Sequence, residues 1–277
     1  MKTIVTHISP DLDAITAVWL IQKYLPGWED AAVKFVPAGS TLDNKSPDEN
    51  PDIIHVDTGM GKFDHHQSDA FTCASQLVFN FIAGDGCVPQ KDRVALEKLI
   101  LLEVEFDHFR DFFFPDPASD RYNIMLHELI EGLKPVIQDD YELVNYASRL
   151  LEAALQNFKN KIAAEEEIKK GFIFDSKWGK TLIMTTASAE ASKLAMKTGY
   201  KLIITKDPKR GYVRIKCPPL KNLDLTELYD KVKKIDSKAN WFLHASKKML
   251  INGSSKNPRM VPSSLSASQL IEIVKGV

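Results

Sequence analysis

Cysteine is scarce in this 277-residue chain. The three cysteines, Cys73, Cys87 and Cys217, lie far apart and form no CxxC pair. Closely spaced pairs would indicate a structural zinc site, and an even set at regular spacing would indicate a disulfide framework, so neither is predicted. We expect buried or incidental thiols in a reducing, cytoplasmic compartment.

Long apolar runs are also missing. The sequence has no stretch of about 18 apolar residues, so we expect no membrane-spanning helix. Residues 1–14, MKTIVTHISPDLDA, reach charged side chains almost at once and contain no small-residue cleavage site, so no secretory signal is expected either. Hydrophobic residues make up 44% of the chain and charged residues 26%, which is typical of a globular protein with one large domain or two ordinary ones.

Charge is distributed unevenly behind a net value of −1. Residues 201–277 contain 16 Lys+Arg and 6 Asp+Glu, a net charge of +10, whereas the first 200 residues contain 20 and 31, a net charge of −11. The acidic N-terminal part of the chain suits cation binding, and the basic C-terminal part suits an anionic ligand. Two differently charged domain surfaces would give the same split, so it gains meaning only beside the motifs.

The order of expected elements predicts an α/β fold. Short apolar runs predict strands over 2–6, 33–38 and 52–58, and apolar residues at helical spacing predict a helix over 13–25. Strand, helix and strand in this order favour a parallel sheet with helices on its faces.

Helical patterns dominate the middle of the chain, and a second α/β pattern follows. We expect helices over 74–84, 91–113 and 139–170, the last ending at Lys169-Lys170-Gly171. The predicted organisation is a parallel-sheet N-terminal domain over 1–138, a helical connector over 139–171, and a smaller, basic α/β C-terminal domain over 172–277 that binds substrate.

The first cluster of metal-competent side chains follows the first strand. His7, Asp11 and Asp13 occur within THISPDLDA, where the next helix begins. In a parallel sheet, loops at the carboxyl ends of strands line the ligand crevice. A single Asp there is more often a helix cap, but a cap needs no imidazole nearby.

The second cluster follows the strand 52–58. Asp57 ends that strand and should therefore emerge at the same sheet edge as His7. Seven residues later, FDHHQ contains Asp64, His65 and His66, and adjacent histidines point in different directions. An isolated His-His pair would be an accidental loop feature, but several sites converging on one edge predict a metal centre.

These motifs resemble those of a known family. HISPDLDAI, then VDTG and then DHH, between positions 7 and 66, are similar to the DHH phosphoesterase superfamily, and the general layout extends over the whole chain. Its members include single-strand exonucleases, nanoRNases and oligonucleotide phosphodiesterases, cyclic-dinucleotide phosphodiesterases and manganese pyrophosphatases. FDHHQ and the following ASQLVFNFI also partly resemble DHH-type exonucleases of mitochondria and nucleoli, which have a different first motif.

The resemblance implies roles for the matched residues. One divalent cation would bind His7, Asp11 and Asp57, and the second would bind Asp13, Asp57 and His65, with Asp57 bridging the two. His66 would contact the phosphate and Asp64 would orient the histidines. A later helix would supply one more carboxylate, for which we select Asp107 over Glu103, Glu105 and Asp111; His108 is expected to face solvent or pack. The family prefers manganese, and these ligands suit Mn²⁺ or Mg²⁺.

The resemblance also implies a substrate-binding loop in the C-terminal domain. This chain departs from the family's Gly-Gly-Gly-His pattern there and reads FLHASKKMLINGSSKNPR over 242–259. A turn with exposed amides, hydroxyls and cations would suit phosphate, although a plain surface turn is the alternative. The predicted phosphate ligands are Asn252, Gly253, Ser254, Ser255, Lys256 and Arg259, with His244, Lys247 and Lys248 as secondary choices. Trp241 and Phe242 could stack on a base, but core packing is favoured.

We therefore predict a two-metal phosphodiesterase or exonuclease that hydrolyses short single-stranded oligonucleotides or nucleotides. The alternatives are an inorganic pyrophosphatase-like or other small phosphate-ester hydrolase, whose Arg-Lys-Lys type loop is not found, and a non-catalytic nucleotide- or nucleic-acid-binding protein. An intact ligand set argues against the last. The sequence leaves the oligomeric state open, a homodimer included, and gives neither DNA against RNA preference nor direction of cleavage.

Overall fold

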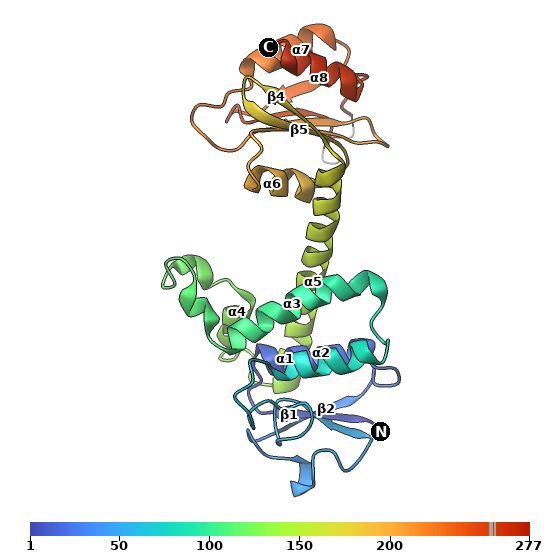
Figure 1. The fold of residues 1–277 in the computed structure, drawn as a ribbon, viewed down its shortest axis with the longest axis vertical. Helices are drawn as coiled ribbons and strands as arrows, with labels where there is room; N and C mark the ends of the chain where they lie inside the picture. Colours follow the sequence, from blue (N-terminus) through green and yellow to red (C-terminus); the bar gives the residue numbers. More distant parts are fainter. Residues whose placement is uncertain (255–256, 258) are drawn as a thin grey trace. The chain divides into compact units, whose positions relative to one another are not determined.

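The computed structural model describes residues 1–254, 257 and 259–277, and it confirms the predicted α/β class. The chain separates into two compact units, Met1–Lys159 and Asn160–Val277 (Figure 1). The division lies inside one long helix, α5 (Asp140–Lys170). The three-part division at 138 and 171 remains a prediction.

The first unit contains the predicted parallel sheet. Its strands are β1 (Thr3–His7), β2 (Ala32–Val36) and β3 (Ile53–His55), in the order β2-β1-β3. Both neighbours run parallel to β1, so all three carboxyl ends lie at one edge. The central strand is buried, because its apolar side chains pack on both faces.

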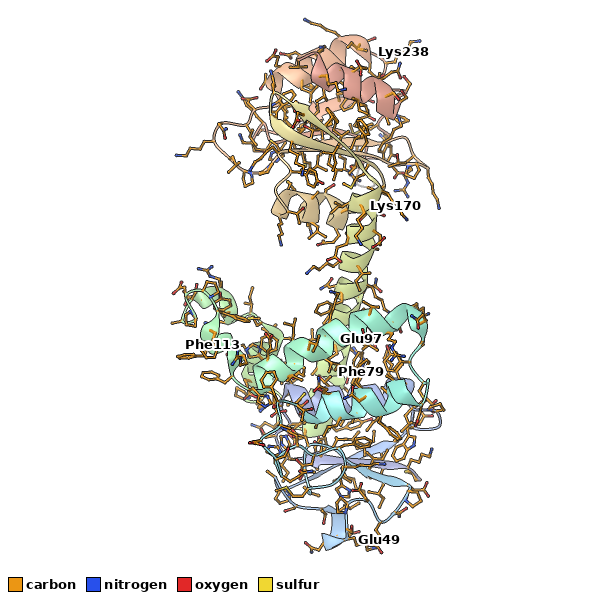
Figure 2. All side chains as sticks on the ribbon, in the orientation of Figure 1. Glu49, Phe79, Glu97, Phe113, Lys170 and Lys238 are labelled. Carbon is orange, nitrogen blue, oxygen red and sulfur yellow. The ribbon has the colours of Figure 1, made fainter. Side chains whose placement is uncertain are left out.

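Helices α1 (Leu12–Tyr24) and α2 (Ala74–Gly84) lie side by side next to this sheet (Figure 1). Nearly every residue of α1 is buried, which explains why its apolar residues are not confined to one face. Helix α3 (Gln90–Asp107) crosses α2, and Figure 2 shows Phe79 between them.

The predicted helix over 91–113 is interrupted. Helix α3 ends at Asp107, and Phe109 adopts a left-handed conformation with φ of 53°. An L-residue with a bulky side chain avoids this region, so the helix cannot continue through it. Short elements follow: η2 (Arg110–Phe113), η3 (Asp120–Tyr122) and α4 (Leu126–Leu133), while η1 (Leu42–Asn44) precedes β3.

The second unit contains a mixed sheet in the order β4-β5-β6-β7-β9-β8, with only the β5–β6 pair parallel among its described strands. The strands are β4 (Phe172–Ser176), β5 (Gly179–Thr185), β6 (Leu202–Lys206), β7 (Val213–Lys216), β8 (Trp241–Leu243) and β9 (Met249–Asn252). The helices are α6 (Ala189–Lys197), α7 (Thr226–Ile235) and α8 (Ala267–Lys275). Helices α7 and α8 contribute to one apolar cluster, and α6 with the end of α5 contributes to another (Figure 1).

The structure also bears on the predictions for the cysteines, for Trp241 and Phe242, and for membrane-spanning helices. Cys73 and Cys217 are buried, Cys87 is partly buried, and all three are free thiols. Trp241 packs in the core, whereas Phe242 is exposed. Within the described residues, no helix combines the length and the apolar character that a bilayer crossing requires.

Candidate metal centre

The motif side chains converge at the carboxyl-end edge of the parallel sheet. His7 is the last residue of β1, and Asp57 follows β3 by two residues. Nε2 of His7 lies 3.2 Å from Oδ2 of Asp57, and Nε2 of His65 lies 3.5 Å from Oδ1 of the same carboxylate. Asp57 therefore faces both histidines, and it lies at the same sheet edge as His7, as the parallel topology led us to expect.

His7, Asp11 and Asp57 form one group of potential ligands, whose donor atoms lie within 4.8 Å of one another. Asp11 is also the N-cap of α1, since its Oδ1 accepts a hydrogen bond of 3.0 Å from the amide of Ala14. A carboxylate has lone pairs for both tasks. The helix cap and the metal ligand are therefore compatible interpretations of Asp11.

Asp13, His65 and Asp107 form the second group. Nε2 of His65 lies 4.0 Å from Oδ2 of Asp13 and 3.7 Å from Oδ2 of Asp107. Both oxygens of Asp13 accept hydrogen bonds, of 2.7 and 2.8 Å, from the amides of Ala74 and Ser75 at the start of α2. These bonds fix the orientation of Asp13 and satisfy donors that a helix N-terminus leaves free.

The competing carboxylates of α3 and its neighbourhood do not belong to the described ligand groups of this centre. Glu103 precedes Asp107 by one helical turn and is only 3% exposed, and burial followed by the charges of Asp13 and Asp11 raises its pKa well above the usual range. Among the described residues, the ligand groups of this edge contain Asp107 and neither Glu103 nor Glu105. His108 packs on Phe71, at 4.5 Å between ring centroids.

Asp64 holds His66 in place. Its Oδ1 accepts hydrogen bonds from the backbone amide and from Nδ1 of His66, at 3.1 and 2.8 Å, and its Oδ2 accepts one of 2.7 Å from the amide of Met60. The Asp64 side chain is buried, whereas that of His66 is 56% exposed. His66 is thus an imidazole with a fixed orientation that faces solvent, and its Nδ1 lies 3.7 Å from Oδ1 of Asp57.

The electrostatics of the centre favour positive charge. Burial opposes the charged form of His7, but the hydrogen bonds to Asp57 and to the carbonyl of Ile8, together with the charges of Asp11 and Asp57, outweigh it and raise its pKa to about 9. The nearby carboxylate of Asp57 likewise raises the pKa of His65 to about 9. Burial, together with the charges of Asp57 and Asp107, raises the pKa of Asp13 to about 7, whereas the two histidines lower that of Asp57 against the effect of burial.

The residues fit a pair of divalent cations. Oδ1 of Asp57 and Nε2 of His65 are buried and have no hydrogen-bond partner among the described residues, which is costly unless another ligand binds them. Imidazole and carboxylate donors suit Mn²⁺, and a majority of carboxylates also suits Mg²⁺. Asp57 has φ of 53°, and such backbone strain in a non-glycine residue is frequent at functional sites.

Two other features of the first unit escaped the sequence analysis. Ala38 and Gly39 line the pocket of the centre beside Asp11 and His66. They follow β2, so the rule that strand ends meet at one edge could have found them. Asp111, His127 and Glu128 form a further group with ligand spacing; no motif in the sequence indicated it.

The predicted substrate residues lie in the second unit. The Asn252 side chain is enclosed: its Nδ2 donates to the carbonyls of Asn240 and Val261, and its Oδ1 accepts from the amide of Ser263. It therefore holds this segment together. Gly253 has φ of +83° and faces the Tyr212 ring so closely that a Cβ atom would lie 2.0 Å from it.

Of the other predicted phosphate ligands, Ser254 forms a β-bridge with Asn257, and Arg259 is exposed. Ser255 and Lys256 lie outside the described residues. A role of this segment in phosphate binding remains a prediction.

Comparison with known proteins gives a limited result. No protein-family model and no curated protein sequence matches the chain. Matching solved structures include a pGpG-specific phosphodiesterase, PggH from Vibrio cholerae, at 12% identity and a TM-score of 0.33 over 98% of both chains. RecJ from Thermus thermophilus, in complex with Mg²⁺, matches at 12% identity and a TM-score of 0.28 over 99% of this chain, which spans 49% of RecJ. The motifs HISPDLDAI, VDTG and DHH, whose His and Asp side chains converge in this centre, are similar to those of the DHH phosphoesterase superfamily.

Proposed function

We propose that this protein is a metal-dependent phosphodiesterase that hydrolyses short single-stranded oligonucleotides or nucleotides. The observation that carries the proposal is the shared position of Asp57, whose two oxygens approach His7 and His65. One carboxylate between two ligand groups can bind a cation with each of its oxygens and so hold a pair of cations close together.

The ligand groups indicate which residues would bind each cation. His7, Asp11 and Asp57 would hold one cation, and Asp13, His65 and Asp107 the other, which Asp57 would share because it also lies beside His65. Mn²⁺ is preferred over Mg²⁺ because imidazoles take part. The cations would supply Lewis-acid stabilisation of the phosphate and activation of water. His66, fixed by Asp64 and open to solvent, would contact the scissile phosphate or the leaving group.

Charge supports a short polyanionic substrate. The metal-binding part of the chain is acidic and residues 201–277 are basic, whereas the whole chain has a net charge of only −1. Proteins that coat long nucleic acid gain affinity from many cationic contacts, which this balance does not favour. The predicted phosphate ligands of the basic part would contribute further contacts: Asn252, Gly253, Ser254, Ser255, Lys256 and Arg259.

The direct test is turnover with three substrates in the presence of Mn²⁺. A labelled single-stranded pentanucleotide is compared with pyrophosphate and with a cyclic dinucleotide, and bound metal is counted in parallel. We expect cleavage of the pentanucleotide. Cleavage of pyrophosphate alone would support the pyrophosphatase-like alternative, and two bound metals without turnover of any substrate would support a binding protein.

A further inference from the structure

Four phenylalanines and an arginine form an exposed cluster in the first unit. Phe71, Phe109, Phe112 and Phe113 are 57, 69, 59 and 67% exposed, and Arg110 lies among them; we call these five residues the aromatic patch. Figure 2 shows Phe113 at the outer edge of the segment that follows α3. Single exposed apolar residues are common, but a contiguous group of large ones marks an interaction site.

The rings and the guanidinium are arranged together. Phe109 and Phe112 lie 6.1 Å apart between centroids, and Phe112 and Phe113 lie 5.2 Å apart. Cζ of Arg110 lies 4.7 Å from the Phe113 ring centre and 6.0 Å from that of Phe71. The patch therefore offers a ligand both aromatic ring faces and a positive charge.

The backbone is strained where the patch begins. Phe109 is in the left-handed region, which is unfavourable for a bulky residue. Two nearby phenylalanines pack inward instead, Phe106 against His127 and Phe114 against Tyr122. Phe106 and Phe114, on either side of the segment, thus pack within the unit, whereas Phe109, Phe112 and Phe113 between them face solvent.

A short chain of contacts links the patch to the metal centre. The Phe71 ring lies 4.5 Å from the ring of His108, whose Nδ1 lies 3.5 Å from Oδ2 of Asp107. The His108 ring in turn lies 6.3 Å from that of His65. A ligand that has a phosphate at Asp107 and His65 would therefore have its adjoining groups within reach of Phe71 and Arg110.

We propose that the aromatic patch is a stacking platform for the nucleobases of an oligonucleotide whose scissile phosphate lies at the metal centre. The inference rests on the proposed function and names the part of the substrate that the first unit recognises. Every base has a π-face, so phenylalanines bind successive bases without sequence preference, and Arg110 complements the phosphates between them. This assigns base recognition to the first unit rather than to the exposed Phe242 of the second.

The test compares a pentanucleotide with an abasic pentamer that has the same phosphates but no bases. The double variant Phe112→Ala/Phe113→Ala is measured beside Phe172→Ala, which removes a similarly exposed ring from β4. Each lost base contact should cost about 1–3 kcal/mol, or roughly 5- to 150-fold in affinity. We expect the double variant to raise KM for the pentanucleotide tenfold or more, to leave KM for the abasic pentamer unchanged, and to keep kcat; Phe172→Ala should change neither KM.

The two proposals fail differently. Equal KM values of the wild type for both pentamers, or equal changes for both in the double variant, would overturn the platform while leaving phosphodiesterase activity intact. A change of oligomeric state in the double variant without loss of base discrimination would assign the patch to a second copy of the chain. If the wild type cleaves neither pentamer, the proposed function fails, and fluorescence anisotropy with both pentamers still decides whether the patch binds bases.

Discussion

Nε2 of His7 lies 3.2 Å from Oδ2 of Asp57, although the two residues are 50 positions apart in the sequence. The parallel pairing of β1 with β3 brings the ends of their strands together, and the left-handed backbone of Asp57 completes the approach. The other oxygen of the same carboxylate faces His65. Asp57 is therefore the position where one substitution affects both ligand groups.

Asp57→Asn should abolish most of the turnover while leaving the fold intact. Asn tolerates a positive φ better than Ala does, so the backbone strain is not increased, but the neutral amide is a poor bridge between cations. Residues that only orient metal ligands account for about 10–100-fold in activity or affinity, so a shared ligand should account for about 100-fold or more. Initial rates with Mn²⁺, metal counting and circular dichroism measure these effects.

The matched control is Asp69→Asn, an exposed carboxylate shortly after the His65-His66 pair. Its activity and metal content should equal those of the wild type. Wild-type turnover in Asp57→Asn would remove the bridging role from this residue.

Sequence reasoning predicted the residues of this edge because parallel strands place their carboxyl ends together, and His7 and Asp57 lie at such ends. Selecting Asp107 depended on the family resemblance, because α3 also contains Glu103 and Glu105 close by, and the sequence alone does not distinguish these carboxylates as metal ligands. The break at Phe109 was missed, because the pattern of α3 continues past the point where the backbone turns. The enclosure of Asn252 was missed as well: strands β8 and β9 are too short to give a clear alternation, and the contacts of Asn252 come from residues up to 12 positions away.

Asp107→Asn should weaken Mn²⁺ binding and Glu103→Gln should leave it unchanged, although the two acids lie on the same face of α3. Asp107 faces His65, so its substitution should weaken Mn²⁺ binding at least about tenfold. Burial raises the pKa of Glu103 and so favours its neutral form, whose shape and neutrality Gln preserves. Calorimetric titration with Mn²⁺ distinguishes the two variants. A strong loss of affinity in Glu103→Gln alone would make Glu103 the ligand.

Asp64→Asn should lower kcat by about 10–100-fold with little change in metal content, because Asp64 orients His66 rather than belonging to the ligand groups. Asp48→Asn is a suitable control, since Asp48 also accepts a hydrogen bond from a loop amide, that of Lys62, at 3.0 Å. Steady-state kinetics and metal analysis of the same preparations separate the two effects. A loss of metal that accompanies the loss of kcat would place Asp64 among the ligands.

Asn252→Ala should reduce the free energy of unfolding by about 2 kcal/mol or more, because it leaves buried backbone groups without partners. Asn222→Ala, at an exposed position, should change it by less than about 0.5 kcal/mol. Urea denaturation of both variants measures the difference. Unchanged stability in Asn252→Ala together with a raised KM would instead support the predicted contact with substrate.

The metal-free protein should lose stability as the pH rises. The native state binds the protons of His7 and His65 up to about pH 9, above the ordinary imidazole pKa of about 6.5, so their contribution is complete below pH 6.5 and is lost as the pH rises through 9. The raised pKa of Asp13, about 7, acts in the same direction. Burial favours the protonated carboxyl group in the folded state, so the free energy of unfolding falls as the pH rises toward 7 and this proton is lost.

Bound Mn²⁺ should reverse this dependence, since cations displace the same protons and bind more tightly as the pH rises. Melting temperatures measured between pH 6 and 9, with a chelator or with Mn²⁺, should therefore separate progressively toward high pH. The double variant His7→Gln/His65→Gln removes both titrating imidazoles, so its metal-free melting temperature should vary less over this range and should respond weakly to Mn²⁺. If the metal-free wild type instead became more stable from pH 6 to 9, the proposed electrostatics of the centre would be wrong. In that description, protonated His7 and His65 neutralise the buried carboxylates when no cation is bound.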